Sequence, residues 1–385
     1  MNIRSPKSPT KYVRSVLVFG ALLTILFSHS AFADDLSITF DNSIGSADYL
    51  LGSKLIEGAS YGTSSFTISS ILTDKLRAYI DVSHMQVYPY SDYSSNDGEV
   101  GLQFRYLEIK DNQVFGGLYA FINRFHDSYS YYNSDGFGAY LKWKHYFKAS
   151  QLIIGGYDLN IDKYDEVAEA SNAEHEIYFT YNQSFATRTS VNFRNAFAYQ
   201  NFWNDLYEVE QIPDNKLIRT EMRLSQSIGQ KIGLTGWLNY QSILNESAGL
   251  FLWQTAINNP FIDRFRWAGP SASMRLSYRV NPRNSLKLVY SYREKEYLDV
   301  PVYAYDFANQ EYLIENEAYV DLGMDRSDDN TSIQLSWNLI LDPDLDDWVP
   351  GIEAVINAGW TINNSNDPLY DYPSKNYSIT LNINN

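Results

Sequence analysis

The amino-acid sequence predicts an all-β protein, a transmembrane antiparallel up-and-down β-barrel of about 16 strands. Three observations predict it. The chain begins with a secretory leader. After it, apolar and polar residues alternate in most segments, and the connections between these segments are short and long in turn. Barrels of this kind cross bacterial outer membranes, so an outer-membrane location surrounded by lipid is expected.

Residues 1–33 have the composition of a signal peptide. Four basic residues (Arg4, Lys7, Lys11 and Arg14) precede an apolar run from Val16 to Phe27, which is followed by Ala31, Phe32 and Ala33. Such a run is too short for a mature transmembrane helix, and small residues before the cut are typical of signal-peptidase sites. Cleavage is expected before Asp34, which leaves 34–385 as a single barrel domain.

The composition excludes several classes of protein. Without the leader, the chain has 26 basic and 46 acidic residues, so nucleic acid is not an expected partner. The chain has no cysteine, which excludes a lipid-modified cysteine anchor and disulfides. Its 32 Tyr, 20 Phe and 8 Trp are many for an acidic soluble protein, whereas a barrel needs aromatic side chains at the membrane surface.

Period-two alternation is clearest in the last segment, where Tyr377, Ile379, Leu381 and Ile383 alternate with polar residues. The same pattern predicts sixteen strands, near 34–42, 62–71, 75–88, 98–109, 113–125, 135–147, 150–163, 174–183, 189–201, 215–228, 231–242, 267–280, 284–297, 329–341, 351–363 and 374–384. Short turns near 73–74, 110–112, 148–149, 187–188, 229–230 and 281–283 alternate with longer loops, of which 298–328 is the longest. That alternation is typical of a barrel with both termini in the periplasm.

A soluble two-sheet sandwich is the main alternative fold. It explains the alternation but not the regular loop lengths, nor the aromatic residues Tyr88, Tyr199, Tyr240, Tyr292 and Trp360 near the loop ends of apolar faces. An aromatic girdle at the lipid headgroups explains those positions.

If the apolar positions face lipid, the opposite positions face the lumen. They include a group of basic residues on neighbouring strands: Arg219, Arg223, Arg275, Arg279, Lys287 and Arg293. Glu221, Glu176, Asp158, Asp81 and Glu99 point inward by the same rule. A lining of salt bridges is the simpler interpretation, and a path that selects anions is the functional alternative.

Other chemistry has less support. The acidic loop 298–328 and the run Asp342, Asp344, Asp346 and Asp347 lack the ligand order of calcium sites, and the histidines have no metal spacing, so no metal or cofactor is expected. His84 follows Ser83, and His126 lies near Ser128, but neither lies in a His-x-Ser-Asn context. We therefore expect no catalytic residues, with a lipid hydrolase as a minor alternative.

The final hairpin carries a resemblance. Asn364-Ser365-Asn366-Asp367-Pro368-Leu369-Tyr370-Asp371-Tyr372, Lys375-Asn376-Tyr377-Ser378-Ile379-Thr380-Leu381 and the preceding Asp325-Arg326-Ser327-Asp328-Asp329 resemble barrel domains linked to tetratricopeptide repeats in surface lipoprotein assembly modifiers. Some exopolysaccharide export porins look similar there. This resemblance implies an export barrel, but the sequence shows no helical repeat domain, and it ends in Asn385 rather than in the aromatic residue that the barrel assembly machinery usually recognises.

These patterns favour a passive channel or export conduit for anionic solutes, polysaccharide or surface proteins. The alternative is a surface-display or adhesion barrel that binds a partner through loops 243–266 and 298–328.

Overall fold

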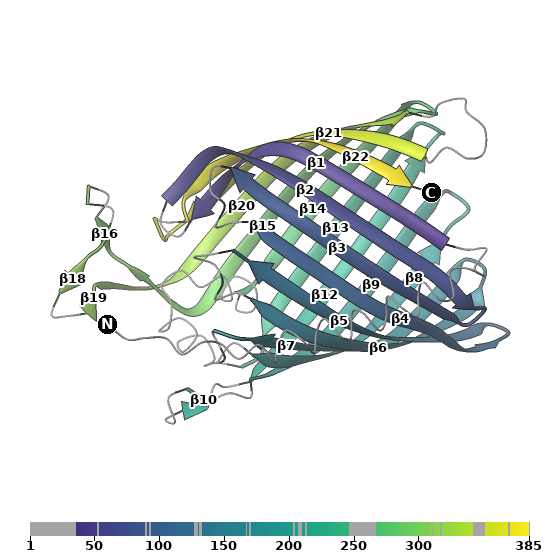
Figure 1. The fold of residues 1–385 in the computed structure, drawn as a ribbon, viewed down its shortest axis with the longest axis horizontal. Coiled ribbons are helices and arrows are strands. Elements are labelled where there is room, and N and C mark those ends of the chain that lie inside the picture. Colours follow the sequence, from purple (N-terminus) through teal and green to yellow (C-terminus); the bar gives the residue numbers. More distant parts are fainter. Residues whose placement is uncertain are drawn as a thin grey trace.

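The computed structural model describes residues 36–384, apart from the gaps 52–53, 89–90, 92–93, 127–129, 131–132, 167, 169–170, 203–204, 207–209, 212–213, 246–266, 307, 310, 316–317, 342–350 and 369. The predicted signal peptide lies outside the described residues, so it stays a prediction. The described chain forms one closed antiparallel barrel of sixteen strands (Figure 1).

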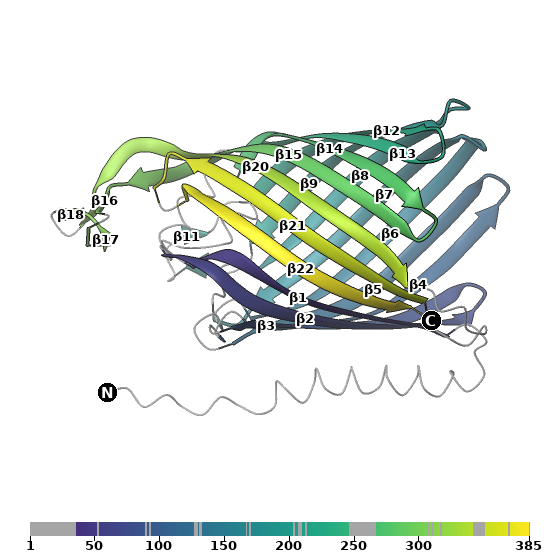
Figure 2. The ribbon, with the colours of Figure 1, turned by 90° about the horizontal axis from the view of Figure 1, so that it is seen from above.

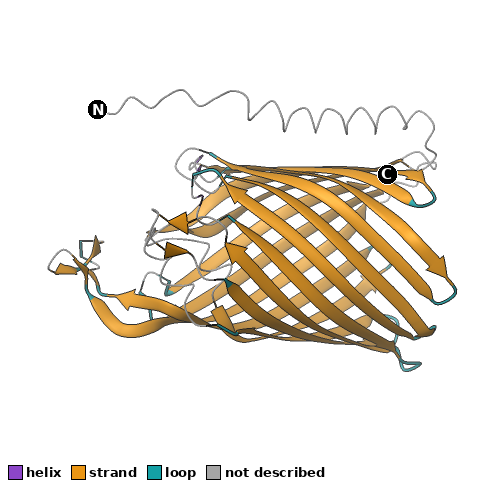
Figure 3. Ribbon diagram, turned by 90° about the horizontal axis from the view of Figure 1, so that it is seen from below, coloured by secondary structure: helices purple, strands orange, loops and turns teal. Residues whose placement is uncertain are grey.

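The barrel strands follow one another in chain order around the wall. They are β1 (Leu36–Leu51), β2 (Lys54–Thr73), β3 (Leu76–Tyr88), β4 (Ser95–Ile109), β5 (Asn112–Phe125), β6 (Ser134–Lys148), β7 (Gln151–Tyr164), β8 (Asn172–Ser184), β9 (Thr189–Phe202), β12 (Asn215–Ile228), β13 (Ile232–Ile243), β14 (Trp267–Asn281), β15 (Asn284–Tyr303), β20 (Asp321–Leu341), β21 (Gly351–Ser365) and β22 (Tyr372–Asn384). The predicted fold class is confirmed, and each predicted strand overlaps one of these. Figure 3 shows the strands tilted around the wall, as closure of a sheet requires.

The first and last strands close the sheet. β1 pairs antiparallel with β22 from Thr39 opposite Asn384 to Ala47 opposite Asn376. No edge of the barrel sheet is therefore left to pair with another chain. The start of β1 and the end of β22 lie with the short turns, one of which uses Gly229 at a φ of +64°, a conformation that glycine adopts without steric cost.

The outer face is apolar. Large hydrophobic side chains are exposed on alternate positions around the wall, for example Ile44 (64% exposed), Ile177 (62%) and Leu238 (59%). Exposure of this extent is unfavourable in water and is satisfied by hydrocarbon, so the closed barrel lies in an outer membrane. The girdle residues Tyr88, Tyr240 and Trp360 are exposed on this face as predicted. No helix among the described residues is long and apolar enough to cross a membrane.

Two hairpins are longer than the sequence pattern predicts. β1 and β2 pair as far as Leu51 and Lys54, and β15 and β20 pair as far as Tyr303 and Asp321. The second hairpin projects beyond the rim and carries the short strands β16 (Tyr305–Asp306), β17 (Glu311–Tyr312), β18 (Ile314–Glu315) and β19 (Ala318–Tyr319) (Figure 2). Two more short strands, β10 (Asp205–Leu206) and β11 (Glu210–Gln211), lie between β9 and β12. Alternation failed to predict these parts because they leave the membrane, where one face need not be apolar.

Candidate functional site: the inner wall of the barrel

The six predicted basic residues form one stripe along the inner wall. Their positions alternate with the lipid-facing residues of β12, β14 and β15. The register of the strand pairs places each residue level with one inward position of β14. In order along β14, Arg219 is level with Gly269, Arg293 with Ser271, Arg223 with Ser273 and Lys287 with Ser277, while Arg275 and Arg279 are on β14 itself. Two residues of strand advance about 6.8 Å, so a cation recurs at about that interval along the strands.

Tryptophan side chains support part of this stripe. The ring of Trp237 lies between two guanidinium groups, 5.5 Å from Cζ of Arg223 and 5.0 Å from Cζ of Arg275. Cζ of Arg293 lies 5.8 Å from the ring of Trp267. Cations held against aromatic rings keep their charge while their position is restricted.

Arg219 differs from the other five residues of the stripe. Its Nη1 lies 2.9 Å from Oε2 of Glu176 and 3.1 Å from Oε1 of Glu174, and Glu176 also pairs with Arg194. The salt-bridge interpretation of the lining therefore holds for Arg219.

The remaining five cations are not neutralised by a carboxylate. Within the described part of the chain, no ion pair or side-chain hydrogen bond is formed by Arg223, Arg275, Arg279, Lys287 or Arg293. An unpaired cation in a wet lumen attracts mobile anions, because its field is screened only by water and salt. Lumen salt bridges therefore do not account for these five cations.

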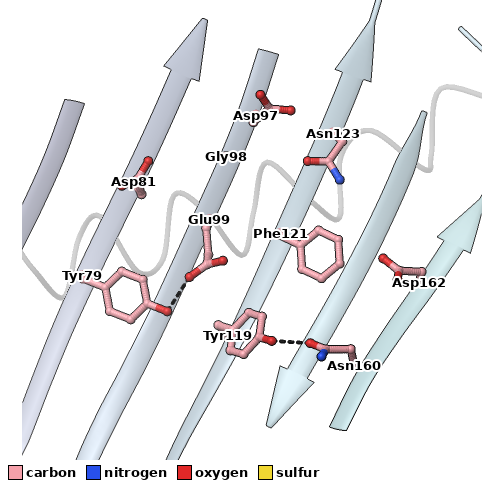
Figure 4. A pocket seen from close by; sticks show the side chains of 10 residues that line it. All are labelled: Tyr79, Asp81, Asp97, Gly98, Glu99, Tyr119, Phe121, Asn123, Asn160 and Asp162. Carbon is pink, nitrogen blue, oxygen red and sulfur yellow. Dashed lines mark hydrogen bonds between the residues drawn. The ribbon is translucent and has the colours of Figure 1, made fainter. Parts of the chain in front are cut away.

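Carboxylates gather on the opposite wall. β3, β4 and β5 stand eight strands away from β13, β14 and β15 in the sixteen-strand order, which is half-way around the barrel. A cavity of about 480 Å³ there is lined by Tyr79, Asp81, Asp97, Gly98, Glu99, Tyr119, Phe121, Asn123, Asn160 and Asp162 (Figure 4). Alternation predicted the inward direction of Asp81 and Glu99, but it did not predict that these residues would line one cavity.

Hydrogen bonds fix the tyrosines of this cavity. The Tyr79 hydroxyl donates to Oε1 of Glu99 over 2.5 Å, and the Tyr119 hydroxyl donates to Asn160 (Figure 4). The Tyr119 ring lies over Gly138 on β6, where an added Cβ would overlap the ring. The absence of a side chain at Gly138 therefore lets the ring lie against the wall.

A buried ion pair lies at the base of the projecting hairpin. Nε of Arg326 donates to Oδ1 of Asp328 over 3.0 Å, and both side chains are about 95% buried. Cζ of Arg326 lies 4.3 Å from the ring centroid of Tyr297 and 3.2 Å from that of Tyr370. The sequence drew attention to this segment only through the resemblance, because a buried pair in a loop has no signature in alternation.

Ser83 and His84 do not form a hydrolase pair. Ser83 and His84 are neighbours on β3, so their side chains point to opposite faces of the wall. Oγ of Ser83 donates to Asp97, while His84 and His126 both contact Asn96. Ser128 and the acidic run from Asp342 to Asp347 lie outside the described residues. No cluster of three or more His, Asp or Glu side chains suited to a metal occurs among the residues that are described.

Comparison with known proteins gives the fold but no family. No family model and no curated protein matches the chain. Among solved structures, a variant of OccD1 (OprD) aligns at a TM-score of 0.52 and 9% identity over 92% of this chain and 96% of its own. Acinetobacter baumannii OccAB1 aligns at 0.52 and 10% over 92% and 97%, and Pseudomonas aeruginosa OccK2 (OpdF) with glucuronate at 0.52 and 8% over 92% and 99%. The chain thus has a porin-like fold, and the resemblance to the tetratricopeptide-linked barrels stays a prediction.

Proposed function

We propose that this barrel is a passive outer-membrane channel for small anionic solutes, guided by Arg223, Arg275, Arg279, Lys287 and Arg293. The observation that carries the proposal is the regular spacing of five unpaired cations along one wall. A permeating anion meets a new cation at each step of about 7 Å along the strand direction, so no single site holds it tightly.

The opposite wall supports the same proposal. Asp81, Asp97 and Glu99 have hydrogen-bond donors but no basic partner among the described residues. Their negative field repels an anion toward the basic wall, where its path is then confined. The OccK2 structure, similar in fold, holds glucuronate, an organic anion of the class we propose.

A flux assay in liposomes tests this function. The purified barrel is expected to pass glucuronate faster than a cation of similar size, and the variant with all five stripe cations changed to Gln is expected to lose that preference. A control variant changes four other cations to Gln, Lys75, Arg188, Lys231 and Arg283, because these lie in the turns outside the lumen wall. Equal preference in the two variants would refute a role for the stripe.

The same assay distinguishes the rival functions. A surface-display or adhesion barrel would pass no solute in any form. A lipid hydrolase would release fatty acid from the liposomes, and the opposite orientations of Ser83 and His84 predict that none is released. Export of polysaccharide or protein would require a partner in the periplasm, for which the described residues provide no repeat domain.

A further inference from the structure

A groove lies on the outer face of the barrel, across the seam where β22 closes against β1 (Figure 2). Its lining comes from five neighbouring strands, β21, β22, β1, β2 and β3. Most of the lining residues point to the lipid-facing side, as the exposed side chains of Ile44, Tyr88 and Ile379 show. Its volume is about 690 Å³, which is within the range of pockets that hold a small molecule.

Four hydroxyl side chains cross this groove in one row. The strand register pairs Tyr377 with Ser46, Ser46 with Ser60, and Ser60 with Tyr88. None of these hydroxyls forms a hydrogen bond within the part of the chain that the structure describes. Tyr88 belongs to the aromatic girdle, so the row lies at the level of the lipid headgroups. A hydroxyl donates to a carbonyl oxygen, and the ester carbonyls of membrane lipids lie at this level.

The floor of the groove is apolar on the side of the row that faces the short turns. Ile44 is level there with Gly62 on β2 and with Ile379 on β22. An added Cβ at Gly62 would meet only the carbonyl oxygen of Ser43, 3.9 Å away. The space over this glycine is therefore open, and an acyl chain fits there without displacing a side chain.

Two aromatic side chains form the walls of the groove. The ring of Tyr377 packs edge-on against that of Trp360, with 6.2 Å between the centroids, so this wall is held in place. Tyr88 is on the other side, three strand intervals or about 14 Å away, with only the two serines of the row between. A flexible chain fills a groove of this shape, whereas the convex wall of a second barrel would rest on the two tyrosines.

A cation lies on the loop side of the hydroxyl row. Lys375 is exposed at the lipid-facing position of β22 next to Tyr377, level with Trp360. Its ammonium forms no ion pair with another described residue. Asp48 lies nearby, but its two carboxylate oxygens accept from the backbone N–H groups of Gly58 and Lys375, each over 2.7 Å. An exposed ammonium at the membrane surface attracts the phosphate of a lipid.

We infer that this groove is a binding site for one acylated lipid that carries a phosphate. The acyl chain lies over Gly62, the ester carbonyls accept from the hydroxyl row, and the phosphate contacts Lys375. The order from the membrane interior to its surface, apolar floor, hydroxyls and cation, is the order of chain, ester and phosphate in such a lipid. The inference concerns the lipid face alone and does not rest on the proposed channel function.

Native mass spectrometry of the purified barrel tests the inference. Dipalmitoyl phosphatidic acid is the probe, and dipalmitoylglycerol, which lacks the phosphate, is the comparison. We expect one phosphatidic acid to bind each barrel at lower concentration than further copies do. Gly62→Leu fills the groove and is expected to lower that affinity at least about tenfold. Gly236→Leu on β13 is the matched control, because this glycine is also lipid-facing and its added Cβ would also meet only a carbonyl oxygen, 3.9 Å away.

Two further variants test the polar contacts. Ser46→Ala with Ser60→Ala removes two hydroxyls without filling the groove, and it is expected to weaken the binding of both lipids. Lys375→Gln is expected to weaken the binding of phosphatidic acid only. Retained heat-modifiable migration in gels shows that each variant is folded, and these two variants decide the result if Gly62→Leu does not fold.

Equal binding in Gly62→Leu and Gly236→Leu, or unchanged binding in the serine variant, overturns the lipid site. An equal loss of both lipids in Lys375→Gln overturns the phosphate contact. Dimers or trimers that disappear only in Gly62→Leu would assign the groove to a second copy of the barrel and also overturn the lipid site.

Discussion

The guanidinium carbon of Arg275 lies 5.0 Å from the ring centroid of Trp237, on the inner wall of the barrel. Arg223 lies 5.5 Å from the same ring, so one indole supports two cations from two different strands. Neither cation has a carboxylate partner among the described residues. On the proposed function, we expect their charge to act on mobile ions in the lumen.

Changing Arg275 to Gln is expected to weaken anion selectivity. A unit charge about 7 Å from a permeating anion contributes about 0.6 kcal/mol in water, which corresponds to a roughly two- to threefold change in the permeability ratio. Arg275→Lys keeps the charge and is expected to keep most of the selectivity. The ratio is measured from zero-current potentials in about 0.1 M salt, where screening is moderate. An unchanged ratio in Arg275→Gln contradicts a role for this cation.

Changing Glu176 to Gln is expected to act in the opposite direction. Glu176 pairs with both Arg194 and Arg219, so loss of its charge leaves two lumen cations less neutralised. Anion selectivity should increase by a similar two- to threefold factor. Selectivity is compared with that of Glu176→Asp, which keeps the charge at this position. A decrease in Glu176→Gln would contradict this account of the network.

The buried pair of Arg326 and Asp328 is expected to stabilise the base of the projecting hairpin. Arg326→Met leaves the Asp328 carboxylate buried without its cation, which costs about 3–5 kcal/mol. The double variant Arg326→Met with Asp328→Leu removes both charges and is expected to recover most of that loss. Limited proteolysis of the 298–328 segment measures the effect. Equal cleavage of the single and double variants would show that the pair does not hold the hairpin.

Tyr312, on the projecting hairpin outside the membrane, is expected to ionise late. Burial raises the pKa of its phenol above 10, and the nearby carboxylate of Asp367 raises the pKa further. The neutral phenol is therefore favoured in the folded hairpin, and it contributes stability below pH 10 that is lost as the pH rises through the raised pKa. The difference in absorbance at 295 nm between the wild type and Tyr312→Phe isolates this group. A midpoint at pH 10 in that difference would mean that the phenol is exposed.

Much of the fold could be predicted from alternation, because a strand between lipid and water must change character at every residue. β12 (Asn215–Ile228) was predicted at the bounds that the structure gives. The extension of β20 back to Asp321 was missed, since the polar segment from Asp325 to Asn330 has the composition of a loop. Once a strand leaves the hydrocarbon, its two faces meet the same solvent and the pattern disappears.

The same reasoning explains which parts of the site were predicted. Alternation assigns each side chain to the lumen or to lipid, so it identified the stripe from Arg219 to Arg293. Register between strands decides which inward residues meet, and sequence alone does not fix it. The pairing of Arg219 with Glu174 and Glu176, which lie two strands away on β8, was therefore not predicted. The cavity lined by Tyr79, Asp81 and Glu99 was missed because its residues come from several strands.

The zero-current potential of the wild-type barrel in a planar bilayer, under a tenfold gradient of KCl, tests the central claim most directly. We predict discrete conductance steps and a potential whose sign shows that chloride crosses faster than potassium. A bilayer that stays silent, or a potential of the opposite sign, would contradict an anion path along the inner wall.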